Sequence, residues 1–594
     1  MLEQAERLLK KYYGYSKFRG GQARVIASIL QGKDTFAIMP TGAGKSICFQ
    51  LPALLFDGLT LIISPLISLM KDQVDTLKDL GIPASFINSS LSNKEVQQRL
   101  DLTAAGEYKI LYIAPERLET DPFRTLVKEL PLSFLAIDEA HCVSQWGHDF
   151  RPSYQRIGPF IKSLDRRPVV AAFTATATEE VQDDILCLLA LNDPKIYITG
   201  FDRSNLYFGV QRQVDKRAFL LNQIKKNPNE AGIIYAATRK EVEKLYDFLE
   251  KQGLAVAKYH AGLSDRERKA FQEEFLHDNR RIMVATNAFG MGIDKSNIRY
   301  VLHYNLPKNM EAYYQEAGRA GRDGEPSECI LLYSPQDVLV QKYLIDQTVY
   351  APVRKRNELA KLQTMIDYAH TPRCLRQFIL EYFGEEETPE QCGNCSNCLE
   401  QAELVDLTEE AQKIFSCLLR MQGAYGVNTL ASVLKGANSK RLRSLGFDRL
   451  STYGVMKDYS LPEIKDLINQ LIAEDYLALT GLRYPVVKLR PKALQVLKEE
   501  RMVRGKRMKE VTVEVQKADP LFERLRSLRK AIAERENVPP YIIFSDSTLR
   551  EMSQRRPVRE EELLLVKGVG QQKLAKYGTQ FLTEIDNYLS EKED

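Results

Sequence analysis

Eight residues near the start of the chain, Met39–Ser46, have the composition of a loop that binds phosphate groups. Gly42 and Gly44 let backbone N–H groups turn inward and approach phosphate oxygens. A helix that follows the loop adds the partial positive charge of its N-terminus. Lys45 would then reach the β- and γ-phosphates of a nucleotide, and the Ser46 hydroxyl would hold Mg²⁺.

The loop departs from the strict G-x-x-x-x-G-K-[ST] pattern at its first position, where Met39 replaces glycine. Taken alone, the stretch could therefore be a chance Gly-Lys-Ser turn at the start of a helix. Its flanks favour the phosphate loop. Apolar Thr35–Met39 is expected to be a buried strand, and Ile47–Leu55 is expected to be a helix that contains one proline.

A second motif, Leu135–His141, brings two adjacent carboxylates to the end of an apolar run. In open α/β sheets, ligands bind at the edge where the strands end. Asp138 would there be the second anchor for Mg²⁺, and Glu139 would activate the attacking water as a general base. The alternative is a pair of solvated carboxylates, which the presence of the Lys45 loop disfavours.

Two further stretches combine aromatic, basic and amide side chains. In Tyr12–Gln22, aromatic and arginine groups can sandwich an adenine ring while a glutamine amide pairs with its edge, although the spacing fits an ordinary helix-capping turn better. The loop Val143–Tyr154 holds the single tryptophan of the chain, Trp146. Its aromatic and basic residues suit stacking on single-stranded bases, and a small hydrophobic plug under the loop would leave the polar partners unexplained.

The stretch Tyr313–Gly324 places Arg319 and Arg322 three residues apart, on one side of a helix or turn. Such a pair can reach across a cleft to charge that develops on a phosphate. An arginine finger of this kind is worth about 10³–10⁵ in rate in well-studied cases.

Four of the nine cysteines form a pattern that binds metal. Cys392, Cys395 and Cys398 are separated by two residues each, and Cys374 at a predicted helix start supplies the fourth thiolate. Four thiolates fit tetrahedral Zn²⁺ and leave no open position for chemistry, so the role would be structural. An iron–sulfur cluster is disfavoured because the continuation x₃-C-P is missing after Cys398.

The elements that position these residues alternate between apolar strands and amphipathic helices, which predicts parallel, doubly wound sheets. In a first region we expect strands at Thr35–Met39, Leu59–Ser64, Ile110–Ala114, Leu135–Asp138 and Val169–Thr174. In a second region, which starts near Leu206, we expect them at Ala231–Tyr235, Val256–Tyr259, Arg281–Ala285, Tyr300–Tyr304 and Cys329–Tyr333. The layout resembles one α/β unit used twice, with ATP between the two copies.

The 594 residues suggest about three to five domains. A hydrophobic content of 44% and a charged content of 27% are typical of a soluble globular protein. No apolar run approaches the roughly 20 residues of a membrane span, and the N-terminus lacks a signal-peptide pattern. We therefore expect an intracellular, cytoplasmic protein. Net charge is only +4, but residues 482–509 hold ten Lys/Arg against two Glu, which suits a phosphate backbone or a solvated helix face.

Residues 408–500 are expected to form helices followed by short β segments. Val427–Leu434, a Gly-Ala-Asn turn and Ser439–Ser444 resemble a helix-turn-helix, and Tyr484–Leu489 suits a wing strand. Residues 435–457 hold six basic side chains and one acidic, which fits phosphate contact or an ordinary basic surface. Residues 501–519 are expected to be a linker. The last segment is expected to be helical, with a turn at Gly568–Gly570 that could present N–H groups to phosphate.

In their order along the chain, five stretches resemble the motif set of superfamily 2 helicases, namely Met39–Ser46, Asp138–His141, Phe173–Thr178, Ala285–Asp294 and Gln315–Arg322. In that superfamily the methionine at 39 is unremarkable. Tyr15–Gln22 and the Trp146 loop resemble features that single out the RecQ family of DNA helicases, and the resemblance extends to the end of the chain. It implies ATP-driven unwinding of duplex or branched DNA with 3′→5′ translocation on single strands, in recombination, repair and replication.

The resemblance also implies roles for individual residues. The catalytic set is Lys45, Asp138, Glu139, Gln315, Arg319 and Arg322. Nucleotide binding is implied for Tyr15, Arg19 and Gln22 at the adenine and for Thr41, Gly42, Gly44, Lys45, Ser46 and Asp138 at the phosphates. Coupling to DNA is implied for Trp146, His148, Phe150 and Arg151. Zinc is held by Cys374, Cys392, Cys395 and Cys398, and magnesium by Ser46 and Asp138.

The expected architecture is α/β, with two RecA-like parallel-sheet motor domains followed by a zinc subdomain, a winged-helix domain and a small all-α HRDC domain. The expected bounds are 1–205, 206–342, 343–405, 406–510 and 518–594. The expected partners are DNA and, in addition, a single-stranded-DNA-binding protein and recombination or repair factors. Nothing resembles a dimerisation seam, so we expect a monomer.

Two alternatives stay open. An RNA helicase would share the motor motifs, but the Trp146 loop, the four cysteines and the winged helix argue against it. A DNA-binding protein that uses ATP only as a switch is disfavoured because every catalytic position is intact.

Overall fold

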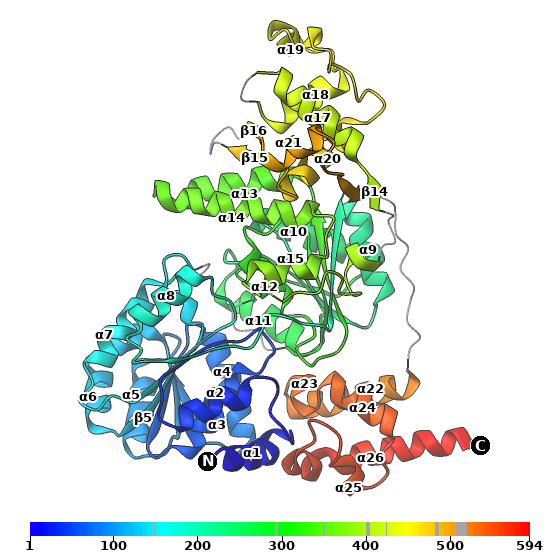
Figure 1. The fold of residues 1–594 in the computed structure, drawn as a ribbon. Helices are drawn as coiled ribbons and strands as arrows, with labels where there is room; N and C mark the ends of the chain where they lie inside the picture. Colours follow the sequence, from blue (N-terminus) through cyan, green and yellow to red (C-terminus); the bar gives the residue numbers. More distant parts are fainter. Residues whose placement is uncertain are drawn as a thin grey trace.

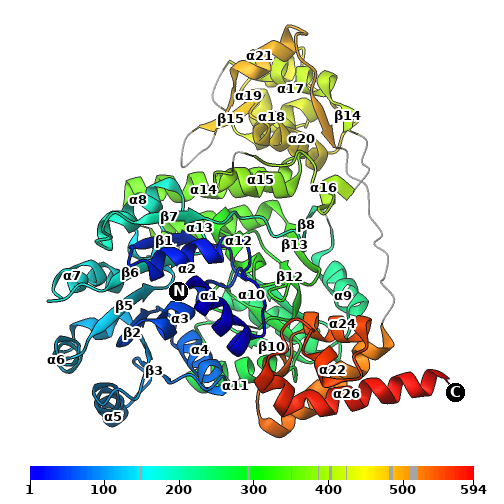
Figure 2. The same cartoon turned by 60° about the horizontal axis from the view of Figure 1, so that its bottom comes forward.

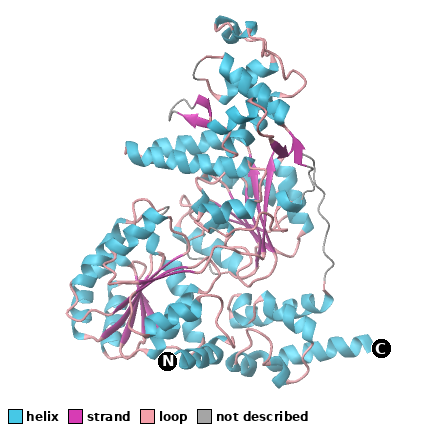
Figure 3. Cartoon of the chain, viewed as in Figure 1, coloured by secondary structure: helices cyan, strands magenta, loops and turns pink. Residues whose placement is uncertain are grey.

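The computed structural model describes residues 1–147, 150–212, 214–290, 295–349, 351–385, 387–399, 404–422, 425–480, 486–506 and 519–593. Two α/β lobes lie side by side, a third group of helices and short strands extends from the second lobe, and a helical domain ends the chain (Figures 1 and 3). His148, the motif end Met291–Asp294, the wing residues Tyr484–Pro485 and the linker residues 507–518 lie outside the described residues.

Lobe 1 is built on a seven-stranded parallel sheet with the order β3-β4-β2-β5-β6-β1-β7. The strands are β1 (Thr35–Ile38), β2 (Leu59–Ile63), β3 (Ala84–Ile87), β4 (Ile110–Ile113), β5 (Leu132–Ile137), β6 (Val169–Thr174) and β7 (Lys195–Ile198). The predicted strands are confirmed to within a few residues. Strands β3 and β7, which are short strands at the two edges of the sheet, were not predicted.

Helices cover both faces of this sheet because successive strand residues point to opposite sides. On β1, Phe36 and Ile38 belong to one apolar core, and Ala37 and Met39 belong to the other. One face packs against α2 (Gln22–Leu30), α3 (Lys45–Leu55) and α4 (Ile67–Asp79). The other face packs against α5 (Asn93–Ala104), α6 (Asp121–Glu129), α7 (Ile157–Lys162) and α8 (Glu179–Leu188). The prediction of a doubly wound sheet is confirmed.

Lobe 2 is also built on a parallel sheet, which has six strands in the order β10-β11-β9-β12-β13-β8. Its strands are β8 (Leu206–Arg212), β9 (Ala231–Tyr235), β10 (Val256–Tyr259), β11 (Ile282–Ala285), β12 (Ile298–His303) and β13 (Ser327–Tyr333). Its helices are α9 (Lys216–Lys226), α10 (Arg239–Glu250), α11 (Asp265–Leu276) and α12 (Met310–Ala317). The first strand, β8, was missed because its mixed polar sequence does not alternate cleanly.

Beyond lobe 2, the chain forms a helical hairpin, a cysteine cluster and a domain with its own core. The hairpin consists of α13 (Pro335–Thr348) and α14 (Pro352–His370), and α15 (Leu375–Tyr382) and α16 (Ser396–Leu399) flank the cysteines. The next domain contains α17 (Thr408–Arg420), α18 (Val427–Lys435), α19 (Lys440–Ser444), α20 (Leu461–Ala473), β15 (Leu477–Thr480), β16 (Val486–Leu489) and α21 (Pro491–Leu497). The antiparallel pair β15–β16 is the expected wing, and the second helix of the predicted helix-turn-helix is only the short α19.

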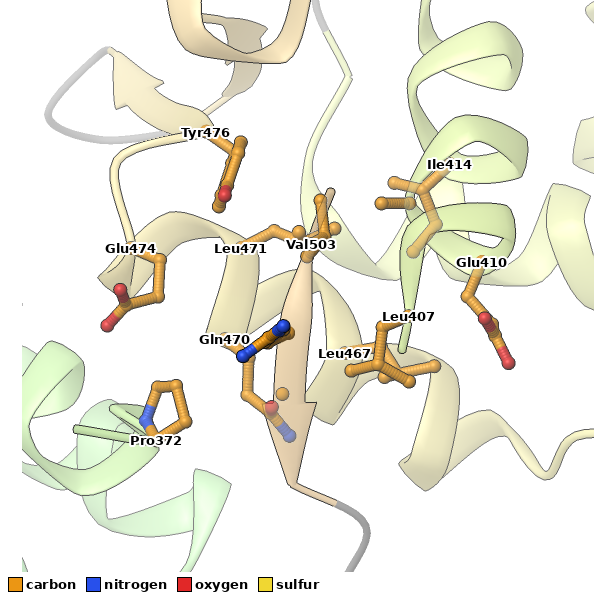
Figure 4. Close-up of a pocket in the computed structure, with 13 residues that line it drawn as sticks. Pro372, Leu407, Glu410, Ile414, Leu467, Gln470, Leu471, Glu474, Tyr476 and Val503 are labelled. Atoms are coloured by element: carbon orange, nitrogen blue, oxygen red, sulfur yellow. The ribbon is translucent and has the colours of Figure 1, made fainter. Parts of the chain in front are cut away.

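Part of the predicted linker is not a linker. Residues Arg504–Lys506 form β17, which pairs with β14 (Leu404–Asp406), because buried Val503 and the close approach of Gly505 to Leu407 anchor this segment in the domain core. Figure 4 shows the apolar crevice at this point, lined by residues of α17, α20 and β17. Its volume of about 10 Å³ is room for about one water molecule, so we regard it as part of the core.

A buried ionic group joins this domain to lobe 2. Arg212 at the end of β8 lies 2.6 Å from the Asp466 carboxylate on α20, and His370 Nδ1 at the end of α14 lies 3.0 Å from the same oxygen. Burial favours the neutral carboxyl, but Arg212 and His370 outweigh it and hold the pKa of Asp466 at about 2. Arg212 and His370, from two separate elements, thus link the domain to the preceding part of the chain.

The C-terminal domain consists of α22 (Pro520–Glu536), α23 (Pro540–Ile543), α24 (Asp546–Arg555), α25 (Glu560–Leu563) and α26 (Gln571–Glu593). Figures 1 and 2 place it against both lobes. Arg526 donates to the carbonyl of Asn229 in lobe 2 at 2.5 Å, and Gln572 Nε2 donates to the carbonyl of Leu80 in lobe 1 at 3.3 Å. No helix among the described residues is both long and apolar enough to span a membrane.

Candidate active site between the two lobes

The predicted phosphate loop lies between the end of β1 and the start of α3, as expected. Gly42 and Gly44 have φ angles of +82° and +80°, the left-handed region that favours glycine. Met39 is fully buried in the lobe 1 core and its sulfur lies 3.8 Å from Cys48 Sγ. An apolar side chain at this first position therefore serves packing, while the two later glycines shape the loop.

Lys45 is the first residue of α3, and its Nζ atom is buried without a hydrogen-bond partner among the described residues. A buried ammonium group without a partner is costly, and a phosphate oxygen is the acceptor that this loop and helix N-terminus are shaped to receive. The residues present therefore fit a bound nucleoside triphosphate.

Asp138 and Glu139 follow β5, next to the loop. Burial, and then repulsion from Glu139, raises the pKa of Asp138 to about 7, against the attraction of Lys45. Such a carboxylate gains from a nearby cation, which fits a divalent metal at Asp138. Glu139 adopts a φ of +48°, a strained conformation for a residue other than glycine, of the kind that occurs at functional sites.

His141 connects this carboxylate pair to the strand beside it. Its Nδ1 atom lies 3.3 Å from Glu139 Oε2 and 2.9 Å from Thr174 Oγ1 at the end of β6. Thr174 begins the polar part of the Phe173–Thr178 motif, so the histidine ring of one motif contacts a second motif 33 residues further along the chain.

The predicted adenine residues lie against the phosphate loop. The guanidinium of Arg19 lies over the Tyr15 ring, 5.5 Å from its centroid, and its Nη1 donates to the carbonyl of Gly42 at 3.2 Å. Gln22 Nε2 donates to the carbonyl of Ala43 at 2.9 Å, and its Oε1 accepts from the Arg19 N–H. An adenine would therefore have to take over bonds that the Gln22 amide now makes within the protein.

The two arginines of the second lobe differ in position. Arg322 lines a cavity whose other walls come from lobe 1, namely Leu9, Tyr15, Lys17, Arg19, Gln22, Gly44 and Ile47. Arg319 is 4% exposed and lies inside lobe 2, where its guanidinium would be 2.5 Å from a Cβ at Gly290. Gln315 is buried on α12 of the same lobe. Arg322 thus lines this cavity and Arg319 does not, and the role of each arginine toward the nucleotide stays a prediction.

Hydrogen bonds link the Trp146 loop to the carboxylate site and to the segment after β2. The Tyr154 hydroxyl donates to the carbonyl of Asp138 at 2.8 Å, and Arg151 Nη1 donates to the carbonyl of Pro65 at 2.8 Å. Trp146 is half-buried against the lobe 1 core, and its carbonyl accepts from Lys361 Nζ of α14 at 3.2 Å. Because the Trp146 side chain is only partly buried, it can pack on the core and still offer surface for stacking on a base. Contact of Trp146, Phe150 and Arg151 with DNA stays a prediction.

The four predicted zinc ligands meet. Their Sγ atoms all lie within 4.8 Å of one another, and no disulfide links the cysteines of the described residues. A tetrahedral zinc site with bonds of about 2.3 Å separates its sulfurs by about 3.8 Å, so the cluster fits the ion. Cys374 is the N-cap of α15, as predicted, and backbone N–H groups of Gln377 and Asn394 donate to sulfurs of the cluster.

Sequence reasoning missed one group of residues at the site, in the segment Phe201–Leu206 that connects the lobes. Arg203 and Asn205 in this segment donate hydrogen bonds to loops of the site. A short charged connection between two strands carries no motif, and only the three-dimensional contacts reveal it.

Two parallel-sheet lobes that share one nucleotide cavity are the motor of ATP-dependent helicases, and the chain is an enzyme of that class. Family descriptions match five successive parts: DEAD/DEAH box helicase at 19–184, helicase conserved C-terminal domain at 215–324, RecQ zinc-binding at 335–399, RQC domain at 401–514 and HRDC domain at 518–585.

Relatives extend the match to the whole chain. It is 49% identical over 589 residues to the ATP-dependent DNA helicase RecQ of Bacillus subtilis, covering 99% of both chains. It is 40% identical over 596 residues to the ATP-dependent DNA helicase RecQ of Haemophilus influenzae, covering 98% and 95%. A putative ATP-dependent RNA helicase of Acanthamoeba polyphaga mimivirus is 38% identical over 493 residues, covering 80% of this chain and 88% of that one. The chain belongs to the RecQ family of helicases.

Proposed function

We propose that the chain couples ATP hydrolysis at the lobe junction to translocation on single-stranded DNA in the 3′→5′ direction, and that it thereby unwinds duplex or branched DNA. The observation that carries the site assignment is the buried Lys45 ammonium, which lies near Asp138 and has no hydrogen-bond partner among the described residues. The neighbouring cavity is lined by Gly44 of the same loop and by Arg322 of the other lobe. The two lobes together supply what phosphoryl transfer requires, which is mainly positioning and charge.

Each residue has a role within this proposal. Lys45 binds the β- and γ-phosphates, and Asp138 with Ser46 holds Mg²⁺, which neutralises phosphate charge when it is bound. Glu139 takes a proton from the attacking water, with His141 holding its carboxylate at 3.3 Å. Arg322 stabilises charge on the transferred phosphoryl group. Tyr15, Arg19 and Gln22 hold the adenine.

DNA contact is proposed for two surfaces. The Trp146 loop is suited to read the single strand, because it is linked to Asp138 through Tyr154 and to α14 through Lys361. The winged-helix domain is suited to hold duplex, because its tip carries exposed Lys440, Arg441 and Arg443.

The first test is steady-state ATP hydrolysis without nucleic acid, with single-stranded DNA and with single-stranded RNA. We expect strong stimulation by DNA, and unwinding of a duplex with a 3′ overhang but not with a 5′ overhang. Equal or greater stimulation by RNA would favour the second candidate, an RNA helicase, which the similarity to the mimivirus protein keeps open. Absence of stimulation by either would contradict the motor.

Glu139→Gln separates hydrolysis from an ATP switch. Loss of a general base lowers turnover by about 10²–10⁴, while the Lys45 loop still binds ATP. A variant that retains both binding and turnover would contradict the role of Glu139.

One chain supplies both walls of the ATP cavity, which supports a monomer as the active unit. Action in the cytoplasm on nucleoid DNA, and recruitment by a single-stranded-DNA-binding protein or by recombination and repair factors, are the corresponding proposals on location and partners.

A further inference from the structure

Arg203, in the segment that connects the lobes, forms hydrogen bonds to both lobes. The guanidinium of Arg203 donates to the carbonyl of Thr41 in the phosphate loop. It also donates to the carbonyls of Gly318, Ala320 and Gly321, at 3.3, 3.0 and 2.9 Å. The last three carbonyls belong to the loop of lobe 2 that carries Arg319 and Arg322.

We propose that Arg203 is a positioning residue for ATP hydrolysis, and that it sets the register of the arginine loop Gly318–Arg322 against the phosphate loop. The inference rests on the proposed ATP site and adds to it a residue of the connecting segment. Its Nη1 atom bonds one carbonyl from each lobe, so a relative movement of the two loops must stretch or break a bond of this one atom.

The two loops approach each other so closely that side chains are excluded between them. A Cβ at Gly318 would lie 2.0 Å from Thr41 Oγ1, and a Cβ at Gly42 would lie 3.1 Å from Arg203 Nη1 and 3.5 Å from Arg322 Cα. In addition, the Thr41 hydroxyl donates to the carbonyl of Gly318 at 3.1 Å. The phosphate loop and the arginine loop are therefore in close contact through the Thr41 side chain, and the Arg203 guanidinium bonds to both loops.

Only arginine can make this set of contacts. Its planar fork offers five N–H donors in fixed directions, whereas the ammonium of lysine is a point charge with three donors. The four acceptors are all carbonyl oxygens, and burial lowers the pKa of Arg203 because the cation has lost its water. A half-buried cation that has lost much of its water and is held by neutral groups costs free energy, and we infer that it serves the alignment of the two loops.

The connecting segment is itself held from a third side. Arg376 of α15 donates to the carbonyl of Arg203 at 2.6 Å, and Asn394 of the zinc knuckle donates to the carbonyls of Ser204 and Leu206 at 3.0 and 3.3 Å. The cysteine-rich subdomain thus holds the backbone of the connecting segment. If one lobe moved relative to the other, the Arg203 side chain could not move with that lobe and keep these bonds.

The test compares Arg203→Ala and Arg203→Lys with the unmodified chain. The measurements are the kcat and the KM for ATP with saturating single-stranded DNA, and the affinities for a fluorescent ADP analogue with and without aluminium fluoride. We expect kcat to fall about tenfold or more in both variants, which is about 1.4 kcal/mol in the barrier. We expect KM and the affinity for ADP to change less than about twofold, because the binding groups stay in place.

The transition-state mimic separates positioning from a general loss of folded protein. The ADP–aluminium fluoride complex needs the arginine loop in register, so its affinity is expected to fall about as much as kcat does. A fall in the affinities for ADP and for the mimic by the same factor would mean a purely structural role and would overturn the proposal. Unchanged kcat and unchanged affinity for the mimic would overturn it as well.

Two further variants guard against misfolding and give a control. Gly318→Ala keeps the guanidinium but forces the loops apart, and it is expected to show the same selective loss. Arg524→Ala removes an arginine of the C-terminal domain that bonds Glu584 and Glu591, and it is expected to leave all four quantities within about twofold. An unmodified chain without DNA-stimulated hydrolysis would instead contradict the proposed function itself.

Discussion

The zinc cluster and the ATP site are assembled from the chain in opposite ways. All four sulfurs come from the stretch Cys374–Cys398, and their spacing already specifies a closed tetrahedral site. The ATP site collects residues from Tyr15 to Arg322, on two lobes and the segment between them. A local site depends on short-range turns. A site between lobes depends on how two independently folded sheets are held relative to each other.

The comparison predicts that the zinc site responds to substitution in an all-or-none manner. Cys395→Ser removes the most buried sulfur of the cluster, and apparent zinc-binding energies of about 10–16 kcal/mol in small structural sites imply complete loss of the ion and unfolding of the subdomain. Zinc per chain and the thermal midpoint measure the effect. Cys187→Ser, at an exposed cysteine on α8, is the control. Retention of one zinc per chain with a normal midpoint would show that the cluster is dispensable.

Substitutions in the ATP site are instead expected to lower the rate of ATP hydrolysis while ATP still binds. Arg322→Ala is expected to lower kcat by about 10³ or more with ATP binding retained, because Arg322 lines the cavity. Arg319→Ala is expected to have the smaller effect on hydrolysis, because Arg319 lies inside lobe 2. Single-turnover hydrolysis of prebound ATP distinguishes the two. If Arg319→Ala were the more damaging variant, the lobes would have to close in a different register.

The third expected effect is a dependence of Mg²⁺ binding at the ATP site on pH near neutrality. The pKa of Asp138 is raised to about 7, so Mg²⁺ must displace a proton below that pH, and its apparent affinity should fall about tenfold per pH unit. In the absence of Mg²⁺, the stability of the folded protein depends on pH in the opposite direction. The contribution of Asp138 is favourable at low pH and is lost as the pH rises through about 7.

Calorimetry in two buffers of different ionisation enthalpy measures the proton released when Mg²⁺ and nucleotide bind. Glu139→Gln removes the neighbouring charge and should move the midpoint to lower pH while leaving the ligands in place. Proton release that is independent of pH between about 5 and 8 would contradict the raised pKa of Asp138.

The smallest expected effect is that of deleting residues 520–594. The C-terminal domain contacts both lobes, yet no described residue of it lines the ATP cavity. We expect kcat to change less than about threefold, under about 0.7 kcal/mol in the barrier. Loss of DNA-stimulated hydrolysis in a soluble, folded truncation would mean that this domain, and not only the connecting segment, aligns the lobes.

Much of the fold could be predicted because it is encoded locally. The strands at β2, β4, β6, β9 and β10 lie within one residue of their predicted bounds, since a buried parallel strand is a short continuous apolar run. Edge strand β7 was missed because it is only partly covered, with Ile196 and Ile198 about half exposed. The fourth zinc ligand, Cys374, was identified correctly from its position at a helix start.

The remainder depends on long-range contacts that no spacing reveals. The sequence of the turn Gly568–Gly570 allows it to present N–H groups to phosphate, and in the structure it packs on lobe 1, where a Cβ at Gly14 would lie 2.8 Å from the Gly570 nitrogen. Adenine recognition by Gln22 stays a prediction, and the bond from its amide to the phosphate loop could not be read from the sequence. The role of Arg203 depends on acceptors 162 and 115 residues away in the chain.

The strand order of lobe 1 has a consequence for synthesis of the chain. Strand β1 ends at Ile38, but its two neighbours in the sheet are β6 and β7, which begin at Val169 and Lys195. As the polypeptide leaves the ribosome, both edges of this apolar strand stay unpaired until β6 and β7 have been synthesised. Pairing between strands so far apart in the sequence is slow. The helical C-terminal domain has mostly local contacts and should fold quickly once it emerges. The nascent first lobe is therefore a stage at which unpaired strand edges favour misfolding and aggregation.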